Sequence, residues 1–103
     1  MQNTLENEIV DLIKLNETRS QIKQIENLVR SGNRVFWVHE GYEVLKYNEE
    51  FNIVFNKGQT DASCIGLSNK NKTSLNGRAN GFFTIDNDGK ENFLFDDTYY
   101  FNK

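Results

Sequence analysis

The chain of 103 residues contains one cysteine, one histidine and no proline. A single cysteine, Cys64, cannot form an internal disulfide, so oxidative cross-links are excluded as a source of stability. No apolar run approaches the length that spans a membrane, and no basic segment followed by an apolar one marks a secretion signal at the start. We therefore expect a cytoplasmic protein, of a bacterium or of a phage-infected cell, with no membrane partner.

The chain also lacks a strong excess of charge of one sign, since its net charge is only −3. An acidic total argues against bulk nucleic-acid binding, which usually needs a basic surface, and this excess is too small for a nucleic-acid mimic. What the sequence does contain is aromatic area, in 8 Phe, 4 Tyr and 1 Trp. At this length we expect a single domain over residues 1–103, helical over 1–33 and β-rich over 34–103.

Residues 3–31 have the periodicity of a helix. Apolar residues recur three and four positions apart, beginning with Leu5 and Ile9, and no proline interrupts them. Gly32 is well placed to end the helix in a left-handed conformation. A break into two helices near Leu15 is the alternative.

An unbroken helix of this length would extend about 40 Å, which is longer than a small sheet can cover. Part of its apolar stripe would then pack against another chain, so a homodimer through the N-terminal helix is one hypothesis. The heptad-like spacing on which it depends is formed by Leu15, Thr18, Ile22, Ile25 and Val29.

After residue 33 the period changes from helical to alternating. Five stretches rich in Val, Ile, Phe and Tyr are predicted to be strands: residues 34–39, 42–47, 51–55, 82–85 and 92–95. Short links at 40–41 and 48–50 force antiparallel hairpins, and 86–89 has the composition of a tight turn. Residues 56–81 are predicted to be mostly loop, with a short strand at 64–67, and 99–101 is a candidate last edge strand.

The fold class predicted by this pattern is α+β. A long N-terminal helix packs on an antiparallel sheet, or on a small curled barrel, of about five or six strands.

Few residues offer catalytic chemistry. His39 lies beside Glu40, and such a pair can act in general acid–base catalysis, but nothing else in the chain completes a constellation. Cys64 could be a nucleophile with His39 as its base. Its apolar surroundings favour core packing instead. We therefore expect no catalytic residues and no enzyme activity.

A fragment of a calcium loop is present at Asp86, Asp88 and Gly89. Lys90 stands where a further oxygen ligand is needed, so a hairpin turn is favoured. No phosphate-binding glycine pattern occurs, and no metal site or cofactor is expected.

Charge is segregated along the chain. The segment 57–78 contains four basic residues, Lys57, Lys70, Lys72 and Arg78, and one acidic residue, Asp61. Such a loop can dock on a protein, follow a phosphate backbone or simply stay solvated. Acidic and aromatic residues follow one another near the C-terminus and are either a binding surface or a last strand over the core: Asp96, Asp97, Tyr99 and Tyr100.

The segment 35–44, Val-Phe-Trp-Val-His-Glu-Gly-Tyr-Glu-Val, followed by hairpins, resembles small accessory proteins of phages and mobile elements. The resemblance implies an inhibitor of host defence of the anti-CRISPR type, whose partner is a host protein or a nucleoprotein effector complex. The residues themselves predict a non-enzymatic protein-binding module. The alternative is a nucleic-acid-binding protein that uses the basic loop 57–78 and sheet aromatics.

Overall fold

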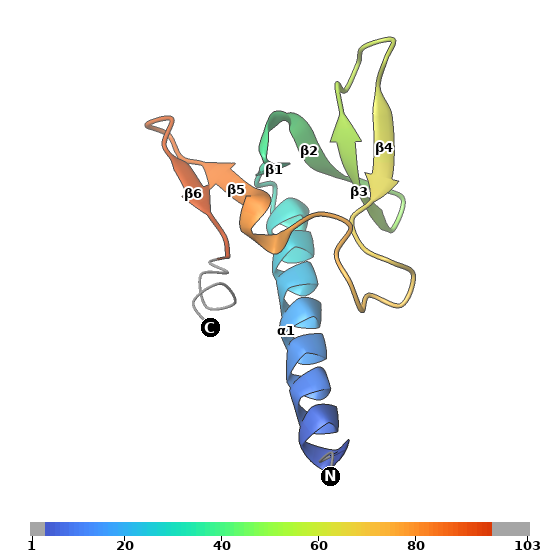
Figure 1. Ribbon diagram of the computed structural model, residues 1–103. Coiled ribbons are helices and arrows are strands. Elements are labelled where there is room, and N and C mark those ends of the chain that lie inside the picture. Colours follow the sequence, from blue (N-terminus) through green and yellow to red (C-terminus); the bar gives the residue numbers. More distant parts are fainter. Residues whose placement is uncertain (1–3, 96–103) are drawn as a thin grey trace.

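The computed structural model describes residues 4–95, with side chains from residue 11 onward. One α-helix is followed by a β-rich segment that contains a short 3₁₀-helix (Figure 1). The elements are α1 (Thr4–Arg30), β1 (Val35–Trp37), β2 (His39–Tyr47), β3 (Glu50–Phe55), β4 (Ser63–Gly66), η1 (Ala79–Gly81), β5 (Phe82–Ile85) and β6 (Glu91–Phe93).

The strands of the described residues form one antiparallel sheet in the order β4-β3-β2-β1-β5-β6. This confirms the α+β class, and the sheet is open rather than closed into a barrel. The chain returns after β4 to add β5 on the far side of β1, so β1 lies inside the sheet and β4 and β6 form its edges.

The helix α1 is continuous, so the alternative of a break near Leu15 does not occur. It ends as the sequence predicted. Gly32 adopts a φ of 90°, its N–H donates to the carbonyl of Val29, and the N–H of Asn33 donates to the carbonyl of Leu28. These two bonds form a Schellman motif, for which glycine has the required conformational freedom. Within the described residues the structure has no helix both long and apolar enough to cross a bilayer.

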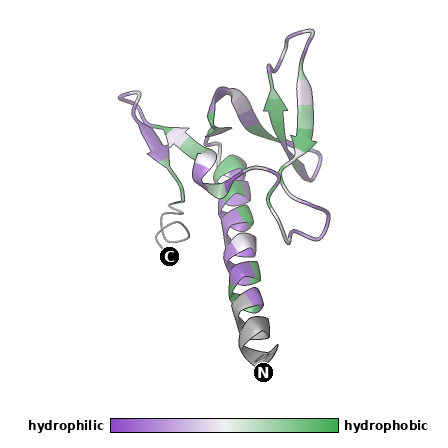
Figure 2. Cartoon of the chain, in the orientation of Figure 1, coloured by the Kyte–Doolittle hydropathy of each residue, from purple (hydrophilic) through white to green (hydrophobic). Residues whose placement is uncertain are grey.

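Only the C-terminal half of α1 packs on the sheet. Ile22 and Ile25 are fully buried, whereas Leu12 and Ile13 are 57% and 53% exposed. Figure 1 shows the N-terminal half extending away from the sheet, and Figure 2 shows both hydrophobic and hydrophilic residues along the part of α1 that it colours. Ile22 and Ile25, which the heptad-like spacing offered to a second chain, are therefore occupied within their own chain.

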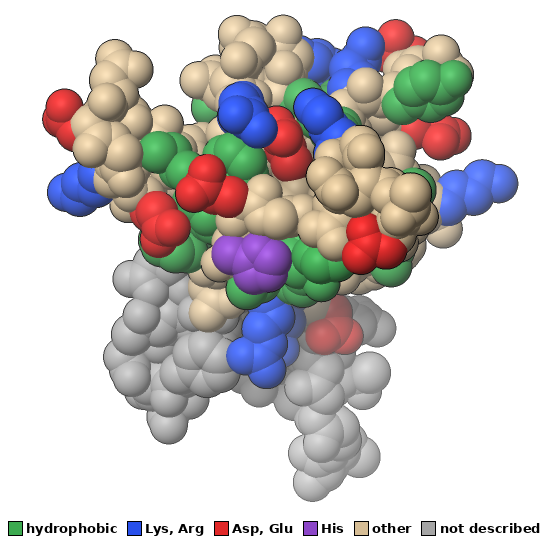
Figure 3. Space-filling model, turned by 90° about the horizontal axis from the view of Figure 1, so that it is seen from above, with side chains coloured by type: hydrophobic (Ala, Val, Ile, Leu, Met, Phe, Trp, Pro, Cys, Tyr) green, Lys and Arg blue, Asp and Glu red, His purple; other side chains and the backbone are tan. Residues whose placement is uncertain are grey.

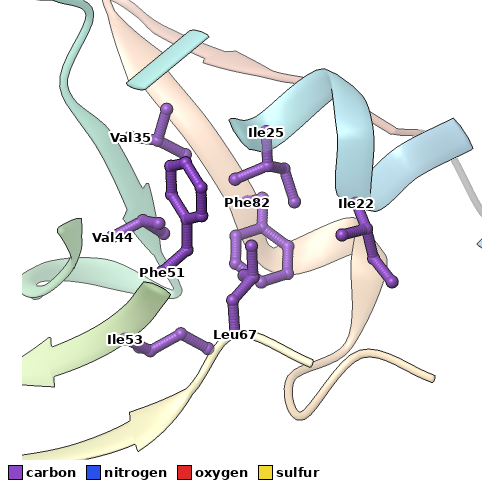
Figure 4. Close-up of a cluster of buried hydrophobic side chains, with 8 residues drawn as sticks. All are labelled: Ile22, Ile25, Val35, Val44, Phe51, Ile53, Leu67 and Phe82. Carbon is purple, nitrogen blue, oxygen red and sulfur yellow. The ribbon is translucent and has the colours of Figure 1, made fainter. Parts of the chain in front are cut away.

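The core lies between α1 and the sheet. Side chains from four strands and from the segment after β4 converge on the helix (Figure 4). The buried cluster consists of Ile22, Ile25, Val35, Val44, Phe51, Ile53, Leu67 and Phe82. Burying apolar area on this scale is the main favourable contribution to folding.

The first hairpin differs from its prediction. Residues 34–39 are not one strand, because β1 ends at Trp37 and β2 begins at His39. The reversal occurs at Val38, with a φ of 69°. The expected link at 40–41 lies inside β2, where three residues bulge between the pairs Phe36–Glu43 and Trp37–His39. Sequence patterning missed this turn because valine rarely adopts a positive φ.

The other turns lie where they were expected. A two-residue loop joins β2 to β3 between the paired Tyr47 and Glu50. In the loop between β5 and β6, Asp86 Oδ1 accepts the N–H groups of Asp88 and Lys90 at 2.9 Å. This confirms the hairpin turn there. The candidate strand at 99–101 lies outside the described residues.

The segment 56–81 is mostly turns and bends, as predicted. It contains β4 and η1, and β4 confirms the short strand with its bounds shifted by one residue. Between them the carbonyl oxygen of the Asn69 side chain accepts the N–H groups of Thr73 and Ser74 at 2.7 and 3.0 Å. Side-chain hydrogen bonds of this kind shape a turn without a strand or helix.

Candidate interaction surface

Aromatic side chains gather where β1, β2 and β3 meet, and we call this group the aromatic end: Trp37, His39, Tyr42 and Phe55. Tyr42 pairs across the strands with Phe55, and their rings lie 4.6 Å apart. The bulge in β2 turns His39 onto Tyr42, with ring centroids 5.0 Å apart, and Trp37 meets Tyr42 edge-on at 5.3 Å. In Figure 3 the single histidine lies beside hydrophobic side chains.

The indole of Trp37 is held by a distant part of the chain. Its Nε1 donates to the carbonyl of Arg78 at 3.1 Å. A Cβ added to Gly77 would lie 2.6 Å from the indole, and one added to Gly81 would lie 2.8 Å from it. Segment 77–81 therefore packs directly on the ring, an approach that only glycine permits.

Val38 protrudes from the aromatic end with a strained backbone. Its φ of 69° places a β-branched residue in the left-handed region, and its side chain is 56% exposed. Such a conformation costs on the order of 1–3 kcal/mol and persists only where neighbouring contacts impose it. Here the N–H of Val38 donates to the carbonyl of Gly81 at 2.8 Å. The strained backbone holds an apolar side chain in solvent, and we therefore consider Val38 a candidate contact site.

The four basic residues predicted to bind a partner do not form one patch. Lys57 follows Asn56 at the end of β3, and the N–H of Asn56 donates to the carbonyl of Gly41 at 3.0 Å, so Lys57 lies near the aromatic end. Arg78 also lies there, because its carbonyl accepts the indole N–H of Trp37. Lys70 and Lys72 follow β4, at the opposite end of the β3–β4 hairpin.

Lys72 is also occupied. Its Nζ lies 2.9 Å from Glu26 Oε2, and the Glu26 side chain is only 7% exposed. This ion pair fastens the segment after β4 to α1, so the role of Lys72 in the structure is to neutralise a buried carboxylate. The four C-terminal residues of the predicted surface, Asp96, Asp97, Tyr99 and Tyr100, lie outside the described residues.

A hollow of about 320 Å³ adjoins this ion pair. Glu26, Glu49, Lys70 and Lys72 are among its lining residues. Glu49 pairs with Lys46 at 3.5 Å, and Glu26 pairs with Lys72. Both of these lining carboxylates are therefore neutralised by lysines of the same chain.

On the sheet face away from the helix, Arg34 forms a bidentate pair with Glu43 at 2.9 and 3.0 Å. These hydrogen bonds, together with the charge of Arg34, lower the pKa of Glu43. The same hydrogen bonds, together with the charge of Glu43, raise the pKa of Arg34. The guanidinium also lies 5.1 Å from the centre of the Phe36 ring. The pair fixes the position of Glu43 beside the bulge in β2.

The two residues considered for catalysis are placed apart in the sheet. The Nδ1 of His39 accepts the N–H of Gly41 at 3.0 Å, which orients the ring toward the strand. Cys64 lies opposite Val54 on the edge strand β4. It is exposed, so the prediction that it packs in the core is wrong. The strand β4 is at the edge of the sheet, so it has a neighbouring strand on one side only. Side chains alternate between the two faces of a strand, and Cys64 lies on the face away from the helix. Among residues 4–95 no three carboxylate, thiol or imidazole groups are arranged to hold a metal ion.

Sequence reasoning missed Val38, Gly77 and Gly81. The two glycines lie four residues apart in a polar segment, a pattern that also fits a solvated loop. Comparisons with protein-family models, with curated proteins and with solved structures give no match to this chain.

Proposed function

We propose that the protein is a non-enzymatic protein-binding module that contacts its partner with the aromatic end. The observation that carries this proposal is Val38, an exposed apolar side chain held in a strained conformation amid packed aromatic rings. A rigid aromatic cluster loses little conformational entropy on binding, and aromatic residues are favoured at the centres of protein interfaces.

A protein partner fits the geometry better than a nucleic acid does. Binding to single strands requires free aromatic faces and a continuous basic groove. Here Tyr42 and Phe55 pack on one another, and the Trp37 ring lies against glycine backbone. The basic residues are divided between two ends of a hairpin, and Lys72 is paired. These features support the protein-binding reading over the nucleic-acid alternative.

The class of partner comes from the resemblance of segment 35–44 to phage accessory proteins. That segment contains three of the four residues of the aromatic end and Val38. We therefore propose a phage-type inhibitor that blocks a host defence protein, as anti-CRISPR proteins do. Occlusion of a partner surface needs no catalytic residue or cofactor.

The test is a comparison of three tagged proteins in lysate of the natural host: the wild type, Val38→Asp and Ile65→Asp. Val38 and Ile65 are similar in exposure, at 56% and 54%, and both are β-branched. Ile65 lies on β4, outside the aromatic end. Aspartate also tolerates a positive φ better than valine.

The expected result is one dominant host protein that survives nuclease treatment, is retained by Ile65→Asp and is lost with Val38→Asp. Loss in both variants, or in neither, would overturn the assignment of the surface. Recovery that collapses with nuclease would favour the nucleic-acid alternative.

A further inference from the structure

The N-terminal half of α1 carries an apolar face separate from the face that packs on the sheet. At 100° per residue, Leu12 and Asn16 point about 130° away from the mean direction of Ile22, Ile25 and Val29. In the sequence, the same period assigns the apolar positions 5 and 9 to the stripe that contains Leu12. Leu12 and the adjoining Ile13 are more than half exposed. The helix therefore changes its apolar face along its length.

This half of the helix has little support of its own. Most of the stability of a helix in a protein comes from tertiary packing of its apolar face, and Leu12 and Ile13 are more than half exposed. The segment also contains β-branched and Asn residues, which are poor helix formers, at Ile9, Val10, Ile13 and Asn16. A helix that extends from its domain in this way gains stability when a partner covers its apolar face.

The face has the residue pattern of a two-stranded coiled coil. With Leu5 and Leu12 at d positions, Ile9 and Asn16 occupy the a positions. Isoleucine at a with leucine at d favours parallel dimers, and a single Asn at a fixes the register of such pairs. The next d and a positions are Arg19 and Lys23, whose like charges would separate the helices before the sheet begins.

We infer that a second copy of this chain covers this face, forming a short parallel coiled coil over residues 5–16. Asn16 of the two copies lies side by side in the seam, and Ile13 widens the apolar contact at its edge. The aromatic end is not part of this interface, so each copy keeps its contact surface for another protein.

The first test is the mass of the full chain in solution, measured by sedimentation equilibrium over a wide concentration range. We expect the mass to rise from 12.0 kDa toward twice that value with concentration. Leu12→Glu should remain monomeric, and Asn16→Ile should dimerise at lower concentration. Lys14→Glu is the matched control, because Lys14 is exposed on the opposite face of α1.

Circular dichroism shows whether each variant folds, which substitution at these three exposed positions should permit. A wild type that stays monomeric at the highest concentration would overturn the proposal and leave residues 96–103 or an unrelated protein as the occupant. Equal effects of Leu12→Glu and Lys14→Glu would overturn it as well.

The orientation is tested with Leu12→Cys in a Cys64→Ser background. A parallel pair brings the two d positions within disulfide range, so oxidation should give a cross-linked dimer. A dimer that forms but does not cross-link would overturn the parallel arrangement.

Discussion

The indole Nε1 of Trp37 donates a 3.1 Å hydrogen bond to the backbone carbonyl of Arg78, across 41 residues of sequence. This bond joins the centre of the sheet to the segment that leads into β5. With the bond from Val38 to Gly81, it fixes the path of the chain as it crosses from one side of β1 to the other. The aromatic end and the sheet order thus depend on the same contacts.

Replacement of Gly77 by alanine is expected to destabilise the fold. The added Cβ would lie 2.6 Å from the Trp37 ring, a distance that requires backbone or ring movement. Overpacking of this kind lowers the free energy of unfolding by about 1–3 kcal/mol, measurable by urea denaturation. In a Trp37→Leu background the cost of Gly77→Ala should fall, and an unchanged cost would contradict the direct contact.

Val38→Asn should increase stability and weaken partner binding together. Asparagine tolerates the positive φ of this position, so relief of strain should raise the free energy of unfolding by about 1 kcal/mol. The apolar contact that we assign to Val38 is lost at the same time. Urea denaturation measures the first effect, and affinity for the captured host protein measures the second. A variant that is more stable and still binds fully would contradict the contact that we assign to the Val38 side chain.

Lys72→Met should destabilise the protein, whereas Lys70→Met should not. Removing Lys72 leaves the buried Glu26 carboxylate with only Arg30, at 3.9 Å. Loss of a buried partner is costly, but Lys72 is half exposed, so we expect a decrease of roughly 1–2 kcal/mol in the free energy of unfolding. Lys70, in the same segment, is the matched control. Equal changes in both variants would show that the ion pair contributes nothing specific.

Glu43→Gln should be less stable than the wild type near neutral pH and equally stable in acid. Arg34 lowers the pKa of Glu43 from its ordinary value of 4.5, so the pair stabilises the fold fully above that pH. The stabilisation is lost as pH falls below 4.5 through the lowered pKa. Since Arg34 is largely exposed, we expect a difference of about 1 kcal/mol.

Unfolding of both proteins at pH 7 and pH 3 measures this difference. The comparison must be between variants, because hydrogen bonds from the N–H groups of Lys90 and Asp88 lower the pKa of Asp86 in the same direction. A difference that persists unchanged at pH 3 would exclude the ion pair as its cause.

Periodicity along the chain was enough to predict the α+β class, the helix end at Gly32 and the hairpins at 48–50 and 86–89. These features depend on neighbours a few residues apart, whose propensities are visible in the sequence. The prediction for Cys64 failed because an apolar run on an edge strand has the same composition as one inside a sheet. The four basic residues of segment 57–78 do not form a single patch because β4 lies within the segment and carries Lys70 and Lys72 to the opposite end of the β3–β4 hairpin.

Apart from the first hairpin, the sequence by itself determined which segments are helix, strand and turn, because hydrogen bonding and apolar period act locally. The tertiary structure alone decided that Val38 reverses the chain, that Gly77 packs against Trp37 and that Lys72 neutralises Glu26. Each of these joins residues that local propensity does not relate, or imposes a conformation that local propensity opposes. Packing of distant segments compensates for the strain of one valine and the desolvation of one carboxylate, and no short window of sequence records that compensation.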